Sequence, residues 1–185
     1  MVRKPIKKWE AELGKLRTNK KWEELLTRSY KCIDEWPEKS CDYFYCGNAK
    51  GEQGLYEEAI KDFDRAIESD PTNTKTYKDR AITTHLFGQN EEAITDLDKA
   101  IELDPKNATA YNNRGFIKSG LGLHDEAIID FNKAIELDPE DKSLLENRAV
   151  TFGIREASKT SRKIEETYRT QLESFTNPSK IRKCF

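Results

Sequence analysis

Four prolines at a constant spacing constrain the fold of this chain more than any other feature. Pro37, Pro71, Pro105 and Pro139 follow one another at intervals of 34 residues. A fixed interval of this size is typical of proteins built from stacked structural repeats. The last three prolines end nearly identical segments, Ile-Glu-Ser-Asp-Pro once and Ile-Glu-Leu-Asp-Pro twice. We therefore expect an array of similar units, each packed against its neighbours.

Aligning the sequence on these prolines brings other positions into columns of similar residues. Ala59, Ile60, Phe63, Ala66 and Ile67 have the spacing of one apolar helix face, and the next two repeats share it. Each Asp-Pro ends a helix, because the residue before proline avoids the helical conformation. Three columns carry the alignment: Trp9, Tyr43, Tyr77, Tyr111 and Leu145; Leu13, Gly47, Ala81, Gly115 and Ala149; and Ile33, Ile67, Ile101 and Ile135. Each unit is therefore expected to be a pair of helices.

These columns resemble the tetratricopeptide repeat. The fullest copy consists of Tyr111, Gly115, Leu121, Gly122, Ala127, Phe131, Ala134 and Pro139. The resemblance is strong over residues 40–139, weaker over residues 6–39, and fades after the first half of a further repeat. It implies an all-α fold: a right-handed superhelical stack of antiparallel helix pairs, or α-solenoid, with a C-terminal capping helix.

We expect a single domain made of successive segments. They are a divergent first repeat (1–39), three repeats (40–73, 74–107 and 108–141), a capping helix (142–176) and a flexible tail (177–185). Helices are expected near 4–17, 20–35, 40–52, 56–69, 74–86, 90–103, 108–120 and 124–137, and in the cap. An apolar stripe in the cap, formed by Ile154, Ala157, Ile164, Tyr168, Leu172 and Phe175, predicts a helix that packs back on the last repeat. Gly153 is expected to bend or interrupt that helix.

Two charged columns predict ion pairs between repeats. One column holds Arg80, Arg114 and Arg148, and the other holds Asp62, Asp96 and Asp130. Pairing each aspartate with the arginine of the next repeat leaves none of them without a partner. We therefore expect the pairs Asp62–Arg80, Asp96–Arg114 and Asp130–Arg148.

Composition and motifs argue against several classes of function. Thirty-two basic residues against thirty-four acidic ones give a net charge of −2, which offers no electrostatic case for nucleic acid. No segment has the apolar length of a membrane span, and the N-terminus lacks a secretory signal, so we expect a cytoplasmic protein with reduced cysteines. The two histidines, His85 and His124, belong to no catalytic or metal motif. We expect neither enzymatic activity, nor a cofactor, nor a bound metal.

The resemblance implies a concave groove, lined by the first helix of each pair, that binds a peptide or a helix of another protein. The residues expected to line it are Phe44, Tyr45, Asn48, Lys75, Lys78, Asp79, Ile82, Leu86, Asn112, Asn113, Phe116 and Asn147. The apolar members mark an interaction surface, unless some pack against the neighbouring second helix. Asn113 and Asn147 repeat at a position where related proteins bond a peptide backbone.

Several alternatives stay open. The basic clamp with which some relatives hold acidic chaperone tails is disfavoured: Lys75 alone fits in the first frame, Asn48 alone in the second, and Lys78 and Asn113 in the last. The chain is expected to be a monomer or a weak homodimer. It is either an adaptor, a protein that self-associates through the groove or the C-terminal helix, or a regulatory subunit of an enzyme complex. Tyr168, Leu172 and Phe175 are also candidates for an internal ligand of the groove.

Overall fold

The structure, a computed structural model, describes residues 3–35 and 40–176, without the side chains of residues 3–10, 32, 34–35, 40–42 and 171–176. Within these ranges the chain forms nine α-helices and no strand. The helices are α1 (Arg3–Thr18), α2 (Trp22–Glu35), α3 (Ser40–Glu52), α4 (Tyr56–Ser69), α5 (Thr74–Leu86), α6 (Asn90–Leu103), α7 (Ala108–Gly120), α8 (His124–Leu137) and α9 (Lys142–Thr176). The predicted all-α solenoid is confirmed.

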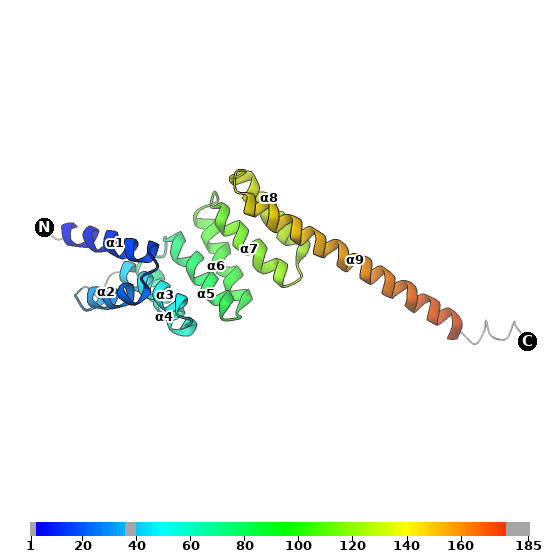
Figure 1. The fold of residues 1–185 in the computed structure, drawn as a ribbon, viewed down its shortest axis with the longest axis horizontal. Coiled ribbons are helices and arrows are strands. Elements are labelled where there is room, and N and C mark those ends of the chain that lie inside the picture. Colours follow the sequence, from blue (N-terminus) through cyan, green and yellow to red (C-terminus); the bar gives the residue numbers. More distant parts are fainter. Residues whose placement is uncertain (1–2, 36–39, 177–185) are drawn as a thin grey trace, which may run out of the picture.

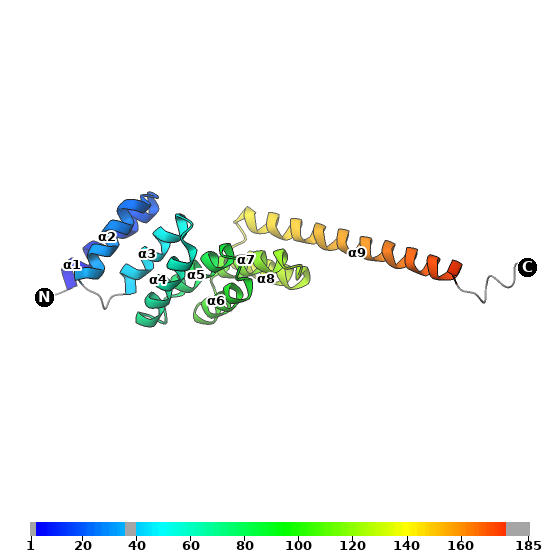
Figure 2. The ribbon, with the colours of Figure 1, turned by 90° about the horizontal axis from the view of Figure 1, so that it is seen from below.

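The helices pack as antiparallel pairs that stack in chain order. Figures 1 and 2 show α1 to α8 side by side along the array, with α9 running out from its far end. First helices contact one another across successive pairs, from α1 and α3 through α7 and α9. The second helices in the described part of the chain do not contact one another. The array therefore curves, and its first helices lie on the inner, concave side.

The small residues of the repeat permit the close approach of paired helices. Ala59, Ala93 and Ala127 are fully buried on the second helices. A methyl group added at Gly47 would lie 2.9 Å from the ring of Phe63, and one at Gly115 would lie 3.0 Å from the ring of Phe131. The glycines therefore make the space that these phenylalanines fill, which explains the alternation of small and large residues in the sequence.

The turns follow from local chemistry. Gly54 and Gly122, between the helices of a pair, have φ values of 79° and 80°, a region that glycine enters without steric cost. Asn73 and Asn107 cap α5 and α7 by accepting hydrogen bonds from the backbone N–H groups of Lys75 and Ala110. The helix expected from residue 20 begins instead at Trp22, because Lys20 ends the preceding turn with φ 55°.

The predicted pattern of ion pairs is wrong. Arg80 Nε donates to Asp96 of its own repeat at 2.8 Å, and Arg114 Nε donates to Asp130 of its own repeat at 2.9 Å. Asp62 also has a partner within its repeat, since Lys50 Nζ lies 2.8 Å from its Oδ2. Lys50 thus takes the role of the absent arginine, so the ends of the array do not require pairing between repeats.

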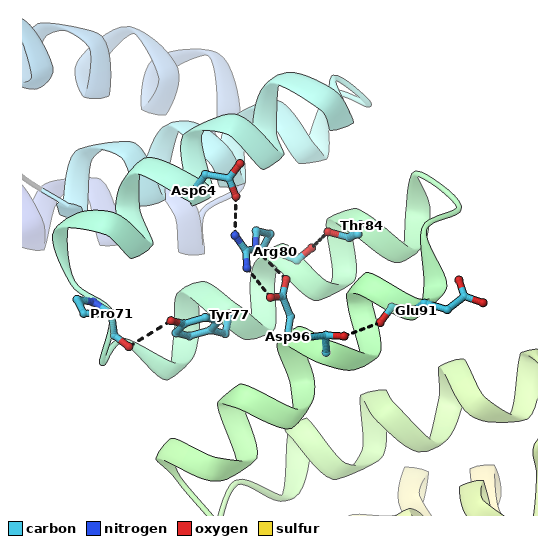
Figure 3. A network of polar contacts seen from close by, with 8 residues as sticks. Asp64, Pro71, Tyr77, Arg80, Thr84, Glu91 and Asp96 are labelled. Atoms are coloured by element: carbon cyan, nitrogen blue, oxygen red, sulfur yellow. Dashed lines mark hydrogen bonds and ion pairs between the residues drawn. The ribbon is translucent and has the colours of Figure 1, made fainter.

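Ion pairs nevertheless join neighbouring repeats, through a second column of aspartates. Arg80 also pairs with Asp64 of α4, and so links three helices (Figure 3). Arg114 does the same through Asp98 of α6. Arg148 makes the corresponding contact with Asn132, at 3.0 Å. In the first repeat the pair within the repeat is reversed in sign: Glu12 stands in the arginine column and pairs with Arg28, which stands in the first aspartate column.

The C-terminal helix also differs from its prediction. α9 is one continuous helix through Gly153, and only its first half packs on the array, through residues such as Leu144 and Thr151. Ile164 and Tyr168 are exposed rather than packed on the last repeat. Leucine and phenylalanine at positions 172 and 175 lie outside the described side chains. The described part of the stripe therefore neither covers the last repeat nor fills the groove.

Candidate partner-binding surface

The candidate surface is the concave face formed by α3, α5, α7 and the start of α9. Four residues occupy the same column of successive first helices, namely Asn48, Ile82, Phe116 and Val150. Because first helices line the inner side of the stack, this column runs along the middle of the concave face. We call the part at α3 and the start of α5 the polar half, and the part from Ile82 onward the apolar half.

Phe44 is not an exposed member of this surface, contrary to the sequence-based expectation. Its side chain is only 7% exposed and its ring packs against those of Phe63 and Tyr45. The guanidinium of Arg17 lies 5.2 Å from the centre of the Phe44 ring and covers its remaining side. Phe44 therefore belongs to the core, as the alternative interpretation of the apolar residues allowed.

The polar half contains a pocket of about 270 Å³. Its lining includes Asn48, Phe63, Asp79 and Thr83, together with Ile82 and Leu86 of the apolar half. A methyl group at Gly51 would lie 3.2 Å from the hydroxyl oxygen of Thr83, so glycine keeps α3 close to α5 here. Gly51, Tyr56, Phe63 and Thr83 were missed by sequence reasoning, because they line the pocket only through the packing of two repeats.

An internal ion pair occupies one wall of this pocket. Arg17 of α1 donates to Asp79 Oδ2 of α5 at 2.6 Å. Burial raises the pKa of Asp79 above the ordinary carboxyl value and outweighs the opposing effects of Arg17, Lys78 and Lys75. The amide of Asn48 is engaged as well, since its Nδ2 donates to the Phe44 carbonyl at 2.8 Å. Much of the charge and hydrogen-bonding capacity of the polar half is thus used within the protein itself.

The apolar half is open to solvent. Ile82, Leu86, Phe116, Val150 and Ile154 are all exposed, Phe116 to 55% and Val150 to 63%. The ring of His85 meets Phe116 edge-on at 6.0 Å, and His85 Nδ1 lies 2.6 Å from Asn90 Oδ1. The histidine therefore braces the Phe116 ring from one side. Ile154, assigned by its spacing to the packing stripe of α9, instead extends this surface.

The asparagines of the apolar half are partly accessible. Asn113 is half-buried, and Asn147 Nδ2 donates to Asn112 Oδ1 at 3.0 Å. That bond joins α7 to α9 and fixes both amides, while each keeps further donor or acceptor capacity. Among the predicted cationic residues, Lys75 is exposed and Lys78 is half-buried near Asp79. Tyr45 is half-buried and packs against the cluster around Leu13.

Within residues 3–35 and 40–176, no group of three metal-ligating side chains comes together. Among the described helices, none has the length and apolar character that a membrane span requires. Buried Lys50 has a raised pKa, since burial is outweighed by the hydrogen bonds and charges of Asp62 and Tyr30, so this lysine is a structural cation.

Comparison with known proteins supports the same interpretation. Models described as tetratricopeptide repeat match residues 46–73 and 108–141, and a model described as TPR repeat matches residues 87–122. A search of curated proteins found no match.

Among similar solved structures is the second TPR domain of human RPAP3 in complex with an HSP70 peptide, with 31% identity and a TM-score of 0.54 over 57% of this chain and 88% of that one. The Arabidopsis OM64 TPR domain has 28% identity and a TM-score of 0.60, and the match covers 63% of this chain and 96% of that domain. MamA from Desulfovibrio magneticus RS-1 has 18% identity and a TM-score of 0.73, and the match covers 96% of this chain and 99% of that one. At this identity the match shows a shared fold. With three matching repeat models and a relative of 31% identity matched over most of its length, the chain belongs to the tetratricopeptide repeat family.

Proposed function

We propose that this protein is a non-catalytic adaptor that binds a helix or an extended peptide of a partner protein on its concave face. The observation that carries the proposal is the apolar half, where Ile82, Leu86, Phe116 and Val150 are exposed together on consecutive first helices. A run of large apolar side chains on one face is typical of a docking surface. We place the main anchor points of the partner there.

The arrangement suits a partner with spaced apolar anchors. Phe116 stands in the middle of the run, between α5 and α9, and His85 restricts its ring. A rigid aromatic residue at the centre of an interface often contributes most of the binding energy. Partner helices dock in such grooves through residues at i, i+3, i+4 and i+7, so a short amphipathic helix is a suitable ligand.

The asparagines would add contacts to the partner's main chain. Asn113 lies beside Phe116 on α7, and Asn147 is held in place by Asn112. An amide offers both a donor and an acceptor, which matches the peptide group without regard to side-chain sequence. We therefore expect main-chain recognition by these amides and side-chain selection by the apolar half.

The relatives support peptide binding but not the same peptide. The human RPAP3 domain was solved with the acidic HSP70 peptide SGPTIEEVD. In this chain the cations needed to hold an acidic tail are largely missing, and Arg17 is already paired with Asp79. A carboxylate without a cation loses most of its attraction to the groove. The proposed partner is therefore apolar rather than acidic.

We further propose that no catalysis takes place on this chain and that it acts in the cytoplasm. His85 is engaged with Asn90 and Phe116, which gives it a structural role. The repeat family to which the chain belongs serves as an interaction module.

The proposal is tested with peptides selected from a phage-displayed library on the wild-type protein. We expect Ile82→Ala/Phe116→Ala/Val150→Ala to weaken the selected peptides by about a hundredfold or more, because it removes three anchors. Ile129→Ala is the matched control, since Ile129 is 66% exposed but lies on the second helix α8. Circular dichroism confirms that both variants are folded. Equal binding by the triple variant and the wild type would refute the assignment.

A further inference from the structure

The outer half of α9 is a helix without a covering surface. From residue 159 to residue 170 every side chain is exposed, and Tyr168 is exposed to 63%. Figures 1 and 2 show this segment running away from the array in both views. An isolated helix of about 12–15 residues is only marginally stable in water, so a surface that covers α9 would stabilise it.

The exposed face of α9 carries a regular stripe. Val150, Ile154, Ala157, Ser161, Ile164 and Tyr168 follow one another at alternating steps of four and three residues. This is the heptad spacing of helices that pack as two-stranded coils. All six side chains are exposed. The stripe begins at the apolar half of the concave face and continues along the projecting helix.

The sizes of the stripe residues favour one orientation of a pair. In a parallel pair, small Ala157 and Ser161 would each face their own copies and leave gaps, while Tyr168 would face Tyr168. In an antiparallel pair, Ile164 of one helix faces Ser161 of the other, and Tyr168 faces Ala157. Large residues then oppose small ones in each of these layers, which packs without voids.

We propose that two copies of this chain associate through α9 as an antiparallel helix pair. The residues that flank the stripe agree with this register. Thr160 of one copy lies opposite Thr167 of the other, and Ser158 lies opposite Glu165, so no like charges meet. The outward-facing positions hold the remaining charges of this segment, Lys159, Arg162, Lys163, Glu166 and Arg169.

The length of α9 agrees with the same register. With residue 161 opposite residue 164, position 150 of one copy lies opposite position 175 of the other. α9 ends at Thr176, so the overlap stops where the exposed stripe begins, at Val150. Twenty-six residues of overlap correspond to about 39 Å of helix. The two arrays then lie at opposite ends of the pair.

Sedimentation velocity of the full chain from low micromolar to near-millimolar concentration tests the association. We expect a reversible dimer of the wild type and of Thr170→Asp, and a monomer of Ile164→Asp. The two variants add the same charge to exposed positions, but residue 164 lies on the stripe and residue 170 does not. Circular dichroism verifies that the array stays folded. A monomeric wild type at every concentration, or a dimer that survives Ile164→Asp, would overturn the proposal.

A pair of double variants tests the orientation. In the antiparallel register Thr160→Lys/Thr167→Glu creates two attractive contacts and Thr160→Lys/Thr167→Lys two repulsive ones. We expect the first variant to dimerise at least about tenfold more tightly than the second. In a parallel pair, the lysine introduced at position 160 would face Glu165 in both variants, and the two would dimerise alike, which would overturn the antiparallel assignment. Neither readout uses a peptide, so failure of the proposed peptide binding would leave both results unchanged. Val150 belongs to both surfaces, so the monomeric Ile164→Asp should bind a peptide at least as well as the wild type.

Discussion

The two halves of the concave face are built on the same repeat but present different chemistry. In the polar half, the column residue is Asn48, its amide is bonded to the Phe44 carbonyl, and Arg17 is paired with Asp79. In the apolar half, the same column holds Ile82, Phe116 and Val150, all of them exposed. The solenoid fold sets the path of a column of side chains. The residue type at each position decides whether its side chain bonds within the protein or stays exposed for a partner.

The contrast between the two halves should disappear in the core beneath them, because the core is built alike in both. Phe63 and Phe131 are each 1% exposed, on α4 and α8. We expect Phe63→Ala and Phe131→Ala to lower the free energy of unfolding by about 3–5 kcal/mol each, through lost burial and the cavity left behind. Urea unfolding followed by circular dichroism measures both. A negligible cost at either site would contradict the assignment of these rings to the core.

The ion pairs of the repeats should differ in strength according to whether their charges are buried or exposed. Arg80→Ala leaves Asp96, which is buried, without its partner, and we expect a loss of about 3 kcal/mol. Arg28→Ala breaks a pair in which both side chains are 37% exposed, and we expect a loss below about 1 kcal/mol. The same urea titration compares them. Equal losses would show that the three-helix contact of Arg80 adds nothing.

Binding should sharpen the contrast between the halves. We expect Phe116→Ala to weaken a selected peptide by about 2 kcal/mol, roughly thirtyfold, because it removes a central aromatic anchor. Asn48→Ala should change the affinity less than about threefold, because its amide is already bonded within the protein. Fluorescence polarisation with a labelled peptide measures both. A larger loss at Asn48 would move the main site to the polar half.

The smallest expected effect is the pH dependence of stability that comes from the Asp79 carboxyl group. The pKa of this carboxyl is raised, so the folded protein keeps a proton that the unfolded chain has released. Stability should therefore fall as the pH rises from the ordinary carboxyl pKa through the raised folded value. Asp79→Asn should remove this dependence, and Arg17→Gln should raise the pKa further by removing the nearest cation.

Carbon-detected NMR titration of the Asp79 carboxyl follows its protonation directly. A pKa at or below the ordinary value in the wild type, or a lower one in Arg17→Gln, would contradict the burial argument.

The repeat columns predicted the helices because they combine many weak signals at one period. The six helices from α3 to α8 have the predicted boundaries, and the small column at Gly47 and Gly115 lies where paired helices approach closely. Side-chain partners were harder to predict. Spacing identified Asp62 and Arg80 as members of two columns, but not that Lys50 reaches Asp62 one turn along α3.

Exposure within the groove also could not be derived from spacing. Phe44 and Phe116 both lie on concave-facing first helices, yet Phe44 is buried and Phe116 is not. The Phe44 ring packs against those of Phe63 and Tyr45 and lies under Arg17 of α1, and these contacts arise only when the helices pack. Similarly, the stripe on α9 was recognised as apolar, but its amphipathic pattern does not say whether the array or another molecule covers it.

The most direct test of the proposed function places a photo-crosslinking residue on each face of the protein in its own cells. p-Benzoylphenylalanine replaces Phe116 on the apolar half in one strain and Ile129 on α8 in another, two exposed apolar positions. We expect a covalent adduct with a distinct partner protein from position 116 and none of the same adduct from position 129. The same adduct from both positions, or from position 129 alone, would contradict binding on the concave face.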